Sequence, residues 1–266
     1  MCQLMGMSAN VPTDARFSFT GLVQRGGGTD IHRDGWGIVF YHGKGMQEFK
    51  DPDPGVDSEV AKLVKLHAIR SKTVISHIRQ ANVGDVNLEN THPFSRELWG
   101  QYWSFAHNGQ LKDGAHLELP LGRYTPVGTT DSEHIFCWML DQISRAFPNR
   151  PANPDMLWQG VASMADRLHS MGVSNFLLSD GQVLIAHCSN KLQWITRRAP
   201  FGEARLKDVA ITVDFAAETT PNDVVTVLAT EPLTVGEAWT AMEPGELIVF
   251  NEGEVCAHFK SLRRLL

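Results

Sequence analysis

Runs of alternating or continuous apolar residues along the chain predict strands. A buried strand is expected over 2–7. A hairpin is expected next, with its first strand over 35–41, a turn at 43–45 and a second strand that ends at Phe49. Further strands are expected over 73–78 and 101–106. Asn108-Gly109 follows the last of these, and this dipeptide is typical of a tight turn. The later chain is mostly strand, at 174–179, 183–188, 192–197, 208–214, 224–229, 246–250 and 255–259.

Helical periodicity occurs in four segments. Thr13-Asp14 is expected to cap a helix that ends at Gly26-Gly27-Gly28, with a phosphate-binding loop as the less favoured reading of the three glycines. A short helix is expected over 58–70, and amphipathic helices over 132–147 and 155–171. The segment 82–97 has no clear period and is expected to be a functional loop.

Composition fits a soluble globular protein. The chain has 266 residues, of which 42% are hydrophobic and 20% charged, and these values exclude a disordered protein. The sequence has no internal repeats, and the Pro-rich stretch 147–154 is too short to be an interdomain linker. We therefore predict one α+β domain over residues 2–266, with two mostly antiparallel sheets and paired helices.

Charge and cysteine usage narrow the function classes. A formal net charge of -6 gives no footprint for nucleic acid, and no stretch has the length and apolarity of a membrane span or signal peptide. The four cysteines lie far apart, as expected for reduced thiols. We therefore expect a cytoplasmic protein without nucleic-acid or membrane partners. Because no nucleotide-binding or metal-binding motif is present, we also expect no cofactor and no metal.

Cys2 is the sharpest chemical feature. Removal of Met1 before this small residue would leave a thiol and a free α-amine on one residue. The unperturbed pKa is about 7.7–8.0 for the amine and about 8.5 for the thiol, so the residue can supply both nucleophile and base. The alternative is that Cys2 is merely a small buried residue near the terminus.

Four further motifs follow in order. Arg79 ends a predicted strand, a His-Pro loop contains Asn90-Thr91-His92-Pro93, His107-Asn108-Gly109 ends another strand, and Thr130-Asp131-Ser132-Glu133 opens a helix. With Cys2 at the start, this set resembles the class II, N-terminal nucleophile glutamine amidotransferases, and most closely their stand-alone form. The resemblance extends over nearly the whole chain and includes Arg25-Gly26-Gly27.

This resemblance implies a four-layer αββα sandwich and a set of site roles. Cys2 would attack the glutamine side-chain amide, giving a γ-glutamyl thioester, ammonia and then glutamate. Asn108 and Gly109 would form the oxyanion hole, Arg79 would bind the substrate α-carboxylate, and Asp131 its α-ammonium group.

Each role has a structural alternative. Arg79 could be a surface ion-pair partner, Asn108-Gly109 a hairpin turn, and Asp131 a helix N-cap, although Thr130 can also supply that cap. His107 and Trp36 are expected to pack near the site, and His92 is expected to be structural.

Two departures from the family pattern leave the reaction open. Gln80 stands where many synthase-linked members have a gating aromatic residue, and no acceptor domain is evident. The first reading is a glutamine amidohydrolase, with or without a separate ammonia-accepting synthase. The second is a hydrolase of another γ-glutamyl amide or conjugate, as in ergothioneine biosynthesis. The third is a non-catalytic subunit that binds a glutamyl metabolite or a partner protein.

Overall fold

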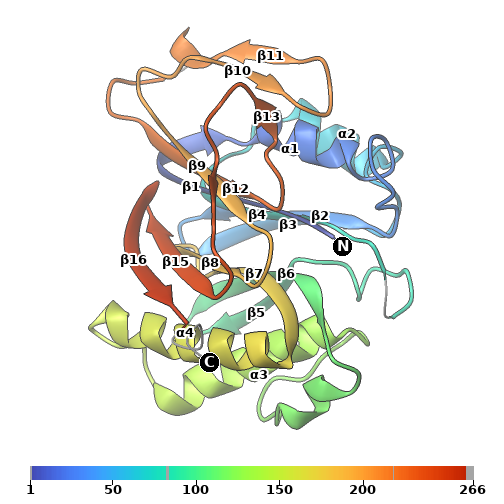
Figure 1. The fold of residues 1–266 in the computed structure, drawn as a ribbon, viewed down its shortest axis with the longest axis vertical. Helices are drawn as coiled ribbons and strands as arrows, with labels where there is room; N and C mark the ends of the chain where they lie inside the picture. The colour runs from blue at the N-terminus through green and yellow to red at the C-terminus, as the bar shows by residue number, and fades with distance from the viewer. Residues whose placement is uncertain (1, 82–83, 218, 262–266) are drawn as a thin grey trace.

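Two large antiparallel sheets form the centre of the computed structural model, which describes residues 2–81, 84–217 and 219–261 (Figure 1). The first sheet has the order β14-β9-β12-β1-β4-β2-β3. Its strands are β1 (Gln3–Asp14), β2 (Trp36–His42), β3 (Gly45–Asp51), β4 (Arg70–Ile78), β9 (Gln193–Arg198), β12 (Val224–Ala229) and β14 (Thr240–Ala241).

The second large sheet has the order β16-β15-β8-β7-β6-β5. Its strands are β5 (Phe94–Leu98), β6 (Gln101–Leu111), β7 (Gly172–Ser179), β8 (Leu184–Cys188), β15 (Glu246–Asn251) and β16 (Glu254–Lys260). A small third sheet joins β10 (Glu203–Leu206), β11 (Thr212–Asp214) and β13 (Thr234–Val235).

Helices cover the outer face of each large sheet. In Figure 1, α1 (Arg16–Gln24) and α2 (Glu59–Leu66) lie on the seven-stranded sheet, and α3 (Asp131–Ala146) and α4 (Pro154–Met171) lie on the six-stranded sheet. Two short 3-10 helices, η1 (Ala115–Glu118) and η2 (Phe215–Ala217), complete the elements. The layers are therefore αββα, as the family resemblance implied.

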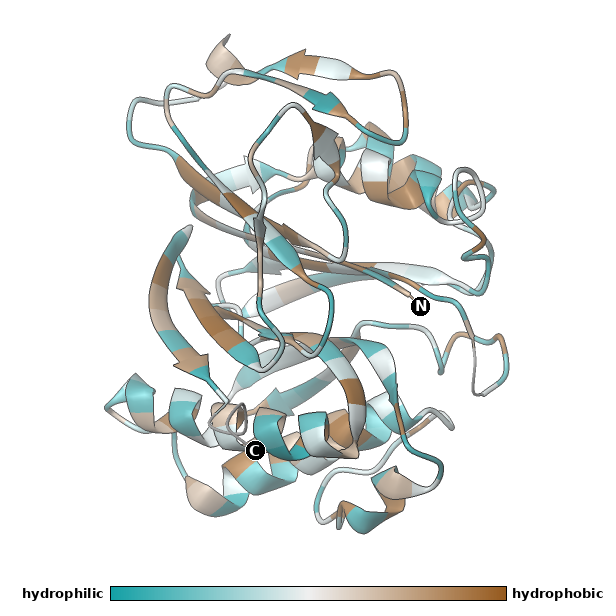
Figure 2. Cartoon of the chain, in the orientation of Figure 1, coloured by the Kyte–Doolittle hydropathy of each residue, from teal (hydrophilic) through white to brown (hydrophobic). Residues whose placement is uncertain are grey.

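Alternation along β1 explains the stacking of the layers. Met5 and Met7 pack in the core that contains Phe19 and Leu22 of α1, whereas Leu4 points the other way and packs against Leu177 of the second sheet. Successive side chains of a strand point to opposite faces, so a strand buried on both faces is continuously apolar. Figure 2 shows hydrophobic residues concentrated on the strands and on the inner helix faces.

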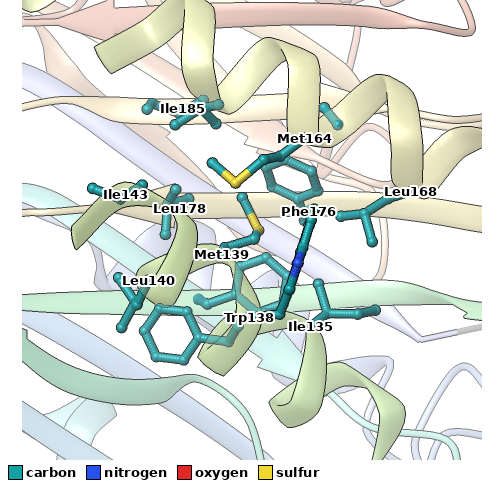
Figure 3. Close-up of a cluster of buried hydrophobic side chains, with 14 of the residues drawn as sticks. Ile135, Trp138, Met139, Leu140, Ile143, Met164, Leu168, Phe176, Leu178 and Ile185 are labelled. Carbon is teal, nitrogen blue, oxygen red and sulfur yellow. The ribbon is translucent and has the colours of Figure 1, made fainter. Parts of the chain in front are cut away.

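The core beneath the six-stranded sheet is built from α3, α4 and the strands β5, β6, β7, β8 and β15. Figure 3 shows Trp138 and Met139 of α3 beside Leu168 of α4, with Phe176 and Leu178 of β7 on the facing sheet. Each of these side chains is at most 2% exposed, and burying one such side chain typically contributes about 1.5–3 kcal/mol. This packing fixes the start of α3, which carries Asp131.

Several boundaries differ from the sequence predictions. Asn108-Gly109 is not a turn, because β6 stays paired with β7 as far as Leu111. Thr13-Asp14 belongs to β1, and α1 begins after Ala15 without a side-chain cap. The helix predicted over 58–70 ends at Leu66, the loop predicted over 82–97 contains the start of β5, and the strand predicted over 208–214 is reduced to β11.

No helix in the described part of the chain is both long enough and apolar enough to cross a membrane.

Candidate active site

A cavity of about 230 Å³ opens where β1 begins, β4 ends and α3 starts. All five predicted site residues line it, namely Cys2, Arg79, Asn108, Gly109 and Asp131. Antiparallel pairing of Gln3 with Ile78 places Cys2 beside the residue that follows β4, which is Arg79. The cavity therefore draws its residues from both large sheets and from one helix.

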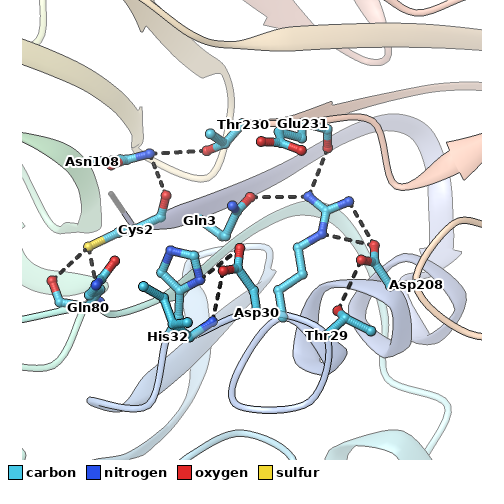
Figure 4. A network of polar contacts seen from close by, with 12 residues as sticks. Cys2, Gln3, Thr29, Asp30, His32, Gln80, Asn108, Asp208, Thr230 and Glu231 are labelled. Carbon is cyan, nitrogen blue, oxygen red and sulfur yellow. Dashed lines mark hydrogen bonds and ion pairs between the residues drawn. The ribbon is translucent and has the colours of Figure 1, made fainter.

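The Cys2 thiol lies against the backbone of Gln80. The Gln80 N–H donates to Cys2 Sγ at 3.3 Å, and the Gln80 carbonyl oxygen lies 3.4 Å from the sulfur as an acceptor (Figure 4). Burial raises the pKa of the Cys2 thiol, while the Gln80 N–H and the charge of Arg79 act in the opposite direction. Because burial dominates, the sulfur is held as a thiol that needs a base to become a nucleophile.

Asn108 connects Cys2 to β6. Its Nδ2 donates to the Cys2 carbonyl oxygen at 2.6 Å and to Thr230 Oγ1 at 3.3 Å (Figure 4). Thr230 Oγ1 also accepts from Leu4 N at 2.9 Å. Asn108 is 1% exposed. The amide on β6 is therefore held at the cavity wall by the residue before β1 and the residue after β12.

Gly109 lies where no side chain fits. A Cβ atom built at this position would be 2.0 Å from the Val173 carbonyl oxygen and 2.8 Å from His107 Nε2. A contact under about 3 Å with backbone requires the strands to separate, so glycine is required by packing within the β6–β7 pair. This reason is independent of turn geometry, the property that the sequence pattern suggested.

Arg79 is not a surface ion-pair partner. Its side chain is buried, and its guanidinium donates to the carbonyl oxygens of Asp85 at 2.9 Å and Gly84 at 3.3 Å. Burial lowers the pKa of Arg79, and the negative charges of Asp34 and Asp85 oppose that change. The guanidinium thus lies at the cavity and ties the end of β4 to the following loop.

Asp131 does not cap the helix that it begins. Thr130 does so, because its Oγ1 accepts from Glu133 N at 3.2 Å. The Asp131 carboxylate instead accepts from Leu111 N at 3.2 Å and from Ser132 Oγ at 3.3 Å. The Asp131 carboxylate therefore borders the cavity and accepts only these two hydrogen bonds among the described residues.

Three buried histidines lie beside the cavity, of which His107 was predicted to pack near the site and His92 to be structural. His92 and His107 line it, and the ring centroids of His77 and His92 are 4.2 Å apart. Burial lowers the pKa of all three, and the pKa of His77 falls to about 3. The rings are therefore neutral at pH 7. His107 Nδ1 lies 2.9 Å from Ser132 Oγ, so this ring joins β6 to the residue after Asp131.

Arg25 has a structural role that its motif, Arg25-Gly26-Gly27, did not predict. It is 3% exposed and donates to Gln3 Oε1 at 3.1 Å, to the Pro232 carbonyl oxygen at 2.6 Å and to Asp208 at 2.9 Å. It thereby holds the residue after Cys2 against the segment that follows Thr230. Its position directly after α1 and before the glycines was the only signal in the sequence.

Within the described residues, no three His, Cys, Asp or Glu side chains gather as metal ligands.

Comparison with known proteins identifies the family. The family of class-II glutamine amidotransferases matches residues 1–264. The chain is 58% identical over 254 residues to Escherichia coli YafJ, which is named a putative glutamine amidotransferase. The match covers 96% of this chain and 99% of that one. A Haemophilus influenzae protein of similar name is 43% identical over 97% of this chain and 86% of its own.

Solved structures agree in fold. The crystal structure of a predicted glutamine amidotransferase from Pseudomonas aeruginosa has 55% identity and a TM-score of 0.77, over 96% of this chain and 100% of that one. The glutamine phosphoribosylpyrophosphate amidotransferase of Bacillus subtilis, at 18% identity, shares the fold with a TM-score of 0.63, over 98% of this chain and 50% of its own. By sequence and by fold, the chain belongs to the class-II glutamine amidotransferase family.

Proposed function

We propose that this protein hydrolyses the side-chain amide of glutamine, with Cys2 as the nucleophile. The observation that carries the proposal is the convergence of Cys2, Arg79, Asn108, Gly109 and Asp131 on one cavity, from four separate parts of the fold. Each side chain has the chemistry that one step of amide hydrolysis needs. The family assignment supports the same reaction class.

The reaction begins with the proton of the Cys2 thiol. After removal of Met1, which lies outside the described residues, the α-amine of Cys2 accepts this proton. The thiolate then adds to the amide carbon of the substrate and forms a tetrahedral oxyanion. Collapse of this intermediate breaks the C–N bond, and the leaving nitrogen takes the proton to depart as ammonia. Water then adds to the γ-glutamyl thioester and releases glutamate and the thiol.

Asn108 supplies a donor to the oxyanion. Both hydrogens of its side-chain NH₂ already have acceptors, the Cys2 carbonyl oxygen at 2.6 Å and Thr230 Oγ1 at 3.3 Å. The longer bond is the weaker one, so the oxyanion replaces Thr230 while the bond to Cys2 keeps the amide in place. The backbone N–H of Gly109 is the second donor, and such donors are each worth about 10²–10³ in rate.

Arg79 and Asp131 recognise the amino-acid end of the substrate. The planar guanidinium of Arg79 can form a bidentate pair with the α-carboxylate, and the Asp131 carboxylate accepts from the α-ammonium group. Because Thr130 caps α3, Asp131 is available for this contact. These two charged side chains bind only the glutamyl part of the substrate. Specificity for the leaving group therefore depends on other residues.

The test combines intact mass with labelling by diazo-oxo-norleucine, a glutamine-like electrophile. We expect the purified chain to lack Met1 and to be labelled once, at Cys2. The Cys2→Ala variant should take no label and show no glutamate release, with an unchanged melting temperature. Cys256→Ser removes an exposed thiol elsewhere and should change neither result. Retention of Met1 with no labelling would favour the non-catalytic subunit that binds a glutamyl metabolite or a partner.

A second candidate is hydrolysis of a larger γ-glutamyl amide or conjugate. The same cavity is also lined by Gln80, Gln110 and Val173, which lie outside the set that reads the glutamyl group. By the family resemblance, Gln80 stands where many synthase-linked members have a gating aromatic residue. A leaving group larger than ammonia would contact these side chains.

Three expectations remain predictions: a single domain over 2–266, a cytoplasmic location, and either a separate ammonia-accepting synthase or none. The substrate panel described in the Discussion addresses the last of these.

A further inference from the structure

A second cavity, of about 330 Å³, lies on the outer face of the seven-stranded sheet, between that sheet, α1 and η2. Its floor contains Met7 and Val227, which are cross-strand partners in β1 and β12, and the neighbouring Val225. It shares no lining residue with the proposed active site. Its volume lies within the range of about 300–1,000 Å³ that is typical of small-molecule sites.

Aromatic rings line the sides of this cavity. Phe17 of α1 and Phe215 of η2 meet edge to face, with ring centroids 5.2 Å apart, and Phe201 is 8% exposed beside them. Aromatic rings attract a further ring in edge-to-face or offset geometry, so an aromatic ligand gains more here than burial alone supplies. The floor of Met7 and Val227, each 2% exposed, is fully apolar.

Among the charged side chains that line the cavity, all but one are engaged in ion pairs or hydrogen bonds. Arg197 forms a two-bond ion pair with Glu237, at 2.7 and 2.6 Å. Both carboxylate oxygens of Asp14 are taken by Arg16.

Asp223, the remaining carboxylate in the lining, accepts from Thr220 with both oxygens. The side chain of Arg70, which also lines the cavity, has no hydrogen bond or ion pair to another residue in the described part of the chain. Asp14, its register partner across β1 and β4, is already occupied by Arg16. The guanidinium of Arg70 thus has donors left for an anion.

We propose that this cavity is a second binding site, which takes a small aromatic carboxylate. The ring lies among Phe17, Phe201 and Phe215, and the carboxylate pairs with Arg70, since guanidinium and carboxylate match as a bidentate pair. The site does not depend on the proposed reaction at Cys2. An experiment that rejects this second site would therefore leave the proposed reaction at Cys2 untouched, and the reverse also holds.

The experiment measures binding of 3-phenylpropionate to the full chain by calorimetry, with 3-phenylpropanamide as the uncharged probe of the same shape. We expect the carboxylate to bind and the amide to bind at least about tenfold more weakly. Arg70→Gln should weaken carboxylate binding by roughly tenfold to a hundredfold, whereas Arg33→Gln, at an exposed arginine elsewhere, should not. Ser18→Trp, from the lining on α1, should block the cavity and abolish binding.

Three results would overturn the proposal: no binding at millimolar concentrations, equal binding of carboxylate and amide, or binding that Arg70→Gln leaves unchanged. The Arg79→Gln variant distinguishes the two cavities, because a carboxylate held in the proposed active site would be lost with Arg79. Loss in Arg79→Gln together with retention in Arg70→Gln would place the ligand beside Cys2 and reject the second site.

Discussion

The side-chain amide of Asn108 donates a hydrogen bond to the carbonyl oxygen of Cys2 across 2.6 Å, and so joins β6 to the residue that precedes β1. These residues are 106 positions apart in the chain, and β1 and β6 belong to different sheets. The bond fixes the distance between the proposed nucleophile and the proposed oxyanion donor before any substrate arrives. Such preorganisation is the basis of electrostatic catalysis, because the donors need not reorganise during the reaction.

Replacing Asn108 should therefore affect the chemical step. For Asn108→Ala we expect kcat to fall by about 10²–10³, with KM changed only a few-fold, because the lost donor acts on the transition state. Steady-state glutamate release measures both constants. Asn10→Ala, which removes an amide remote from the cavity, is the matched control. A large rise in KM at constant kcat would contradict the assigned role.

Arg79→Lys should show the opposite pattern. Lysine keeps the positive charge but loses the planar pair of donors, so we expect KM to rise by about tenfold or more with a smaller change in kcat. Arg33→Lys, at an exposed arginine, should leave both constants unchanged. If the Arg79 variant lost kcat while KM stayed constant, substrate binding would not be its function.

Ser132 should act on binding through Asp131. Its Oγ lies between Asp131 Oδ1 at 3.3 Å and His107 Nδ1 at 2.9 Å, so Ser132→Ala frees the carboxylate to rotate. We expect KM to rise several-fold with little change in kcat, and Ser132→Thr to restore KM because the hydroxyl returns. The role is wrong if alanine and threonine give the same KM.

Buried histidines predict a loss of stability in acid. The folded pKa of His77 is about 3 and that of His187 about 4, both below the ordinary value of 6.5, because burial disfavours the charged ring. Above pH 6.5 both states are neutral, but as the pH falls toward 4 the unfolded state takes up more protons. The free energy of unfolding should therefore decrease, by up to about 1.4 kcal/mol per pH unit for each histidine. Urea titrations between pH 7 and about pH 4 measure this slope.

The His77→Gln variant isolates one histidine from the rest. It should lower stability at neutral pH but flatten the slope of stability against pH, since one titrating group is gone. An unchanged slope would mean that His77 takes up a proton in the folded state.

The isolated chain should hydrolyse a γ-glutamyl substrate without an added synthase. A panel of glutamine, γ-glutamyl alkylamides and γ-glutamyl conjugates, scored by glutamate release, identifies the leaving group. Faster turnover of a conjugate than of glutamine would favour the second candidate function. Activity that arises only after addition of cell extract would instead indicate an obligate partner.

The sequence by itself determined the fold class and the candidates for the site residues. The period of apolar residues depends only on neighbours in the chain, so β12 was predicted at 224–229 and α4 to within a residue of its start. The five proposed site residues could be selected because each stands in a short motif of distinctive composition, and all five line one cavity.

Tertiary structure decided what local signals could not. Asn108-Gly109 has the local preference of a turn, but pairing with β7 keeps it extended, since non-local hydrogen bonds override a weak local propensity. Asp131 could have been a helix cap, but the side chain of Thr130 supplies the cap, which leaves the Asp131 carboxylate for the proposed substrate contact. The cavity beside Arg70 exists only because β1, β4, α1 and η2 meet in space, and nothing in any one of these segments indicates that they do.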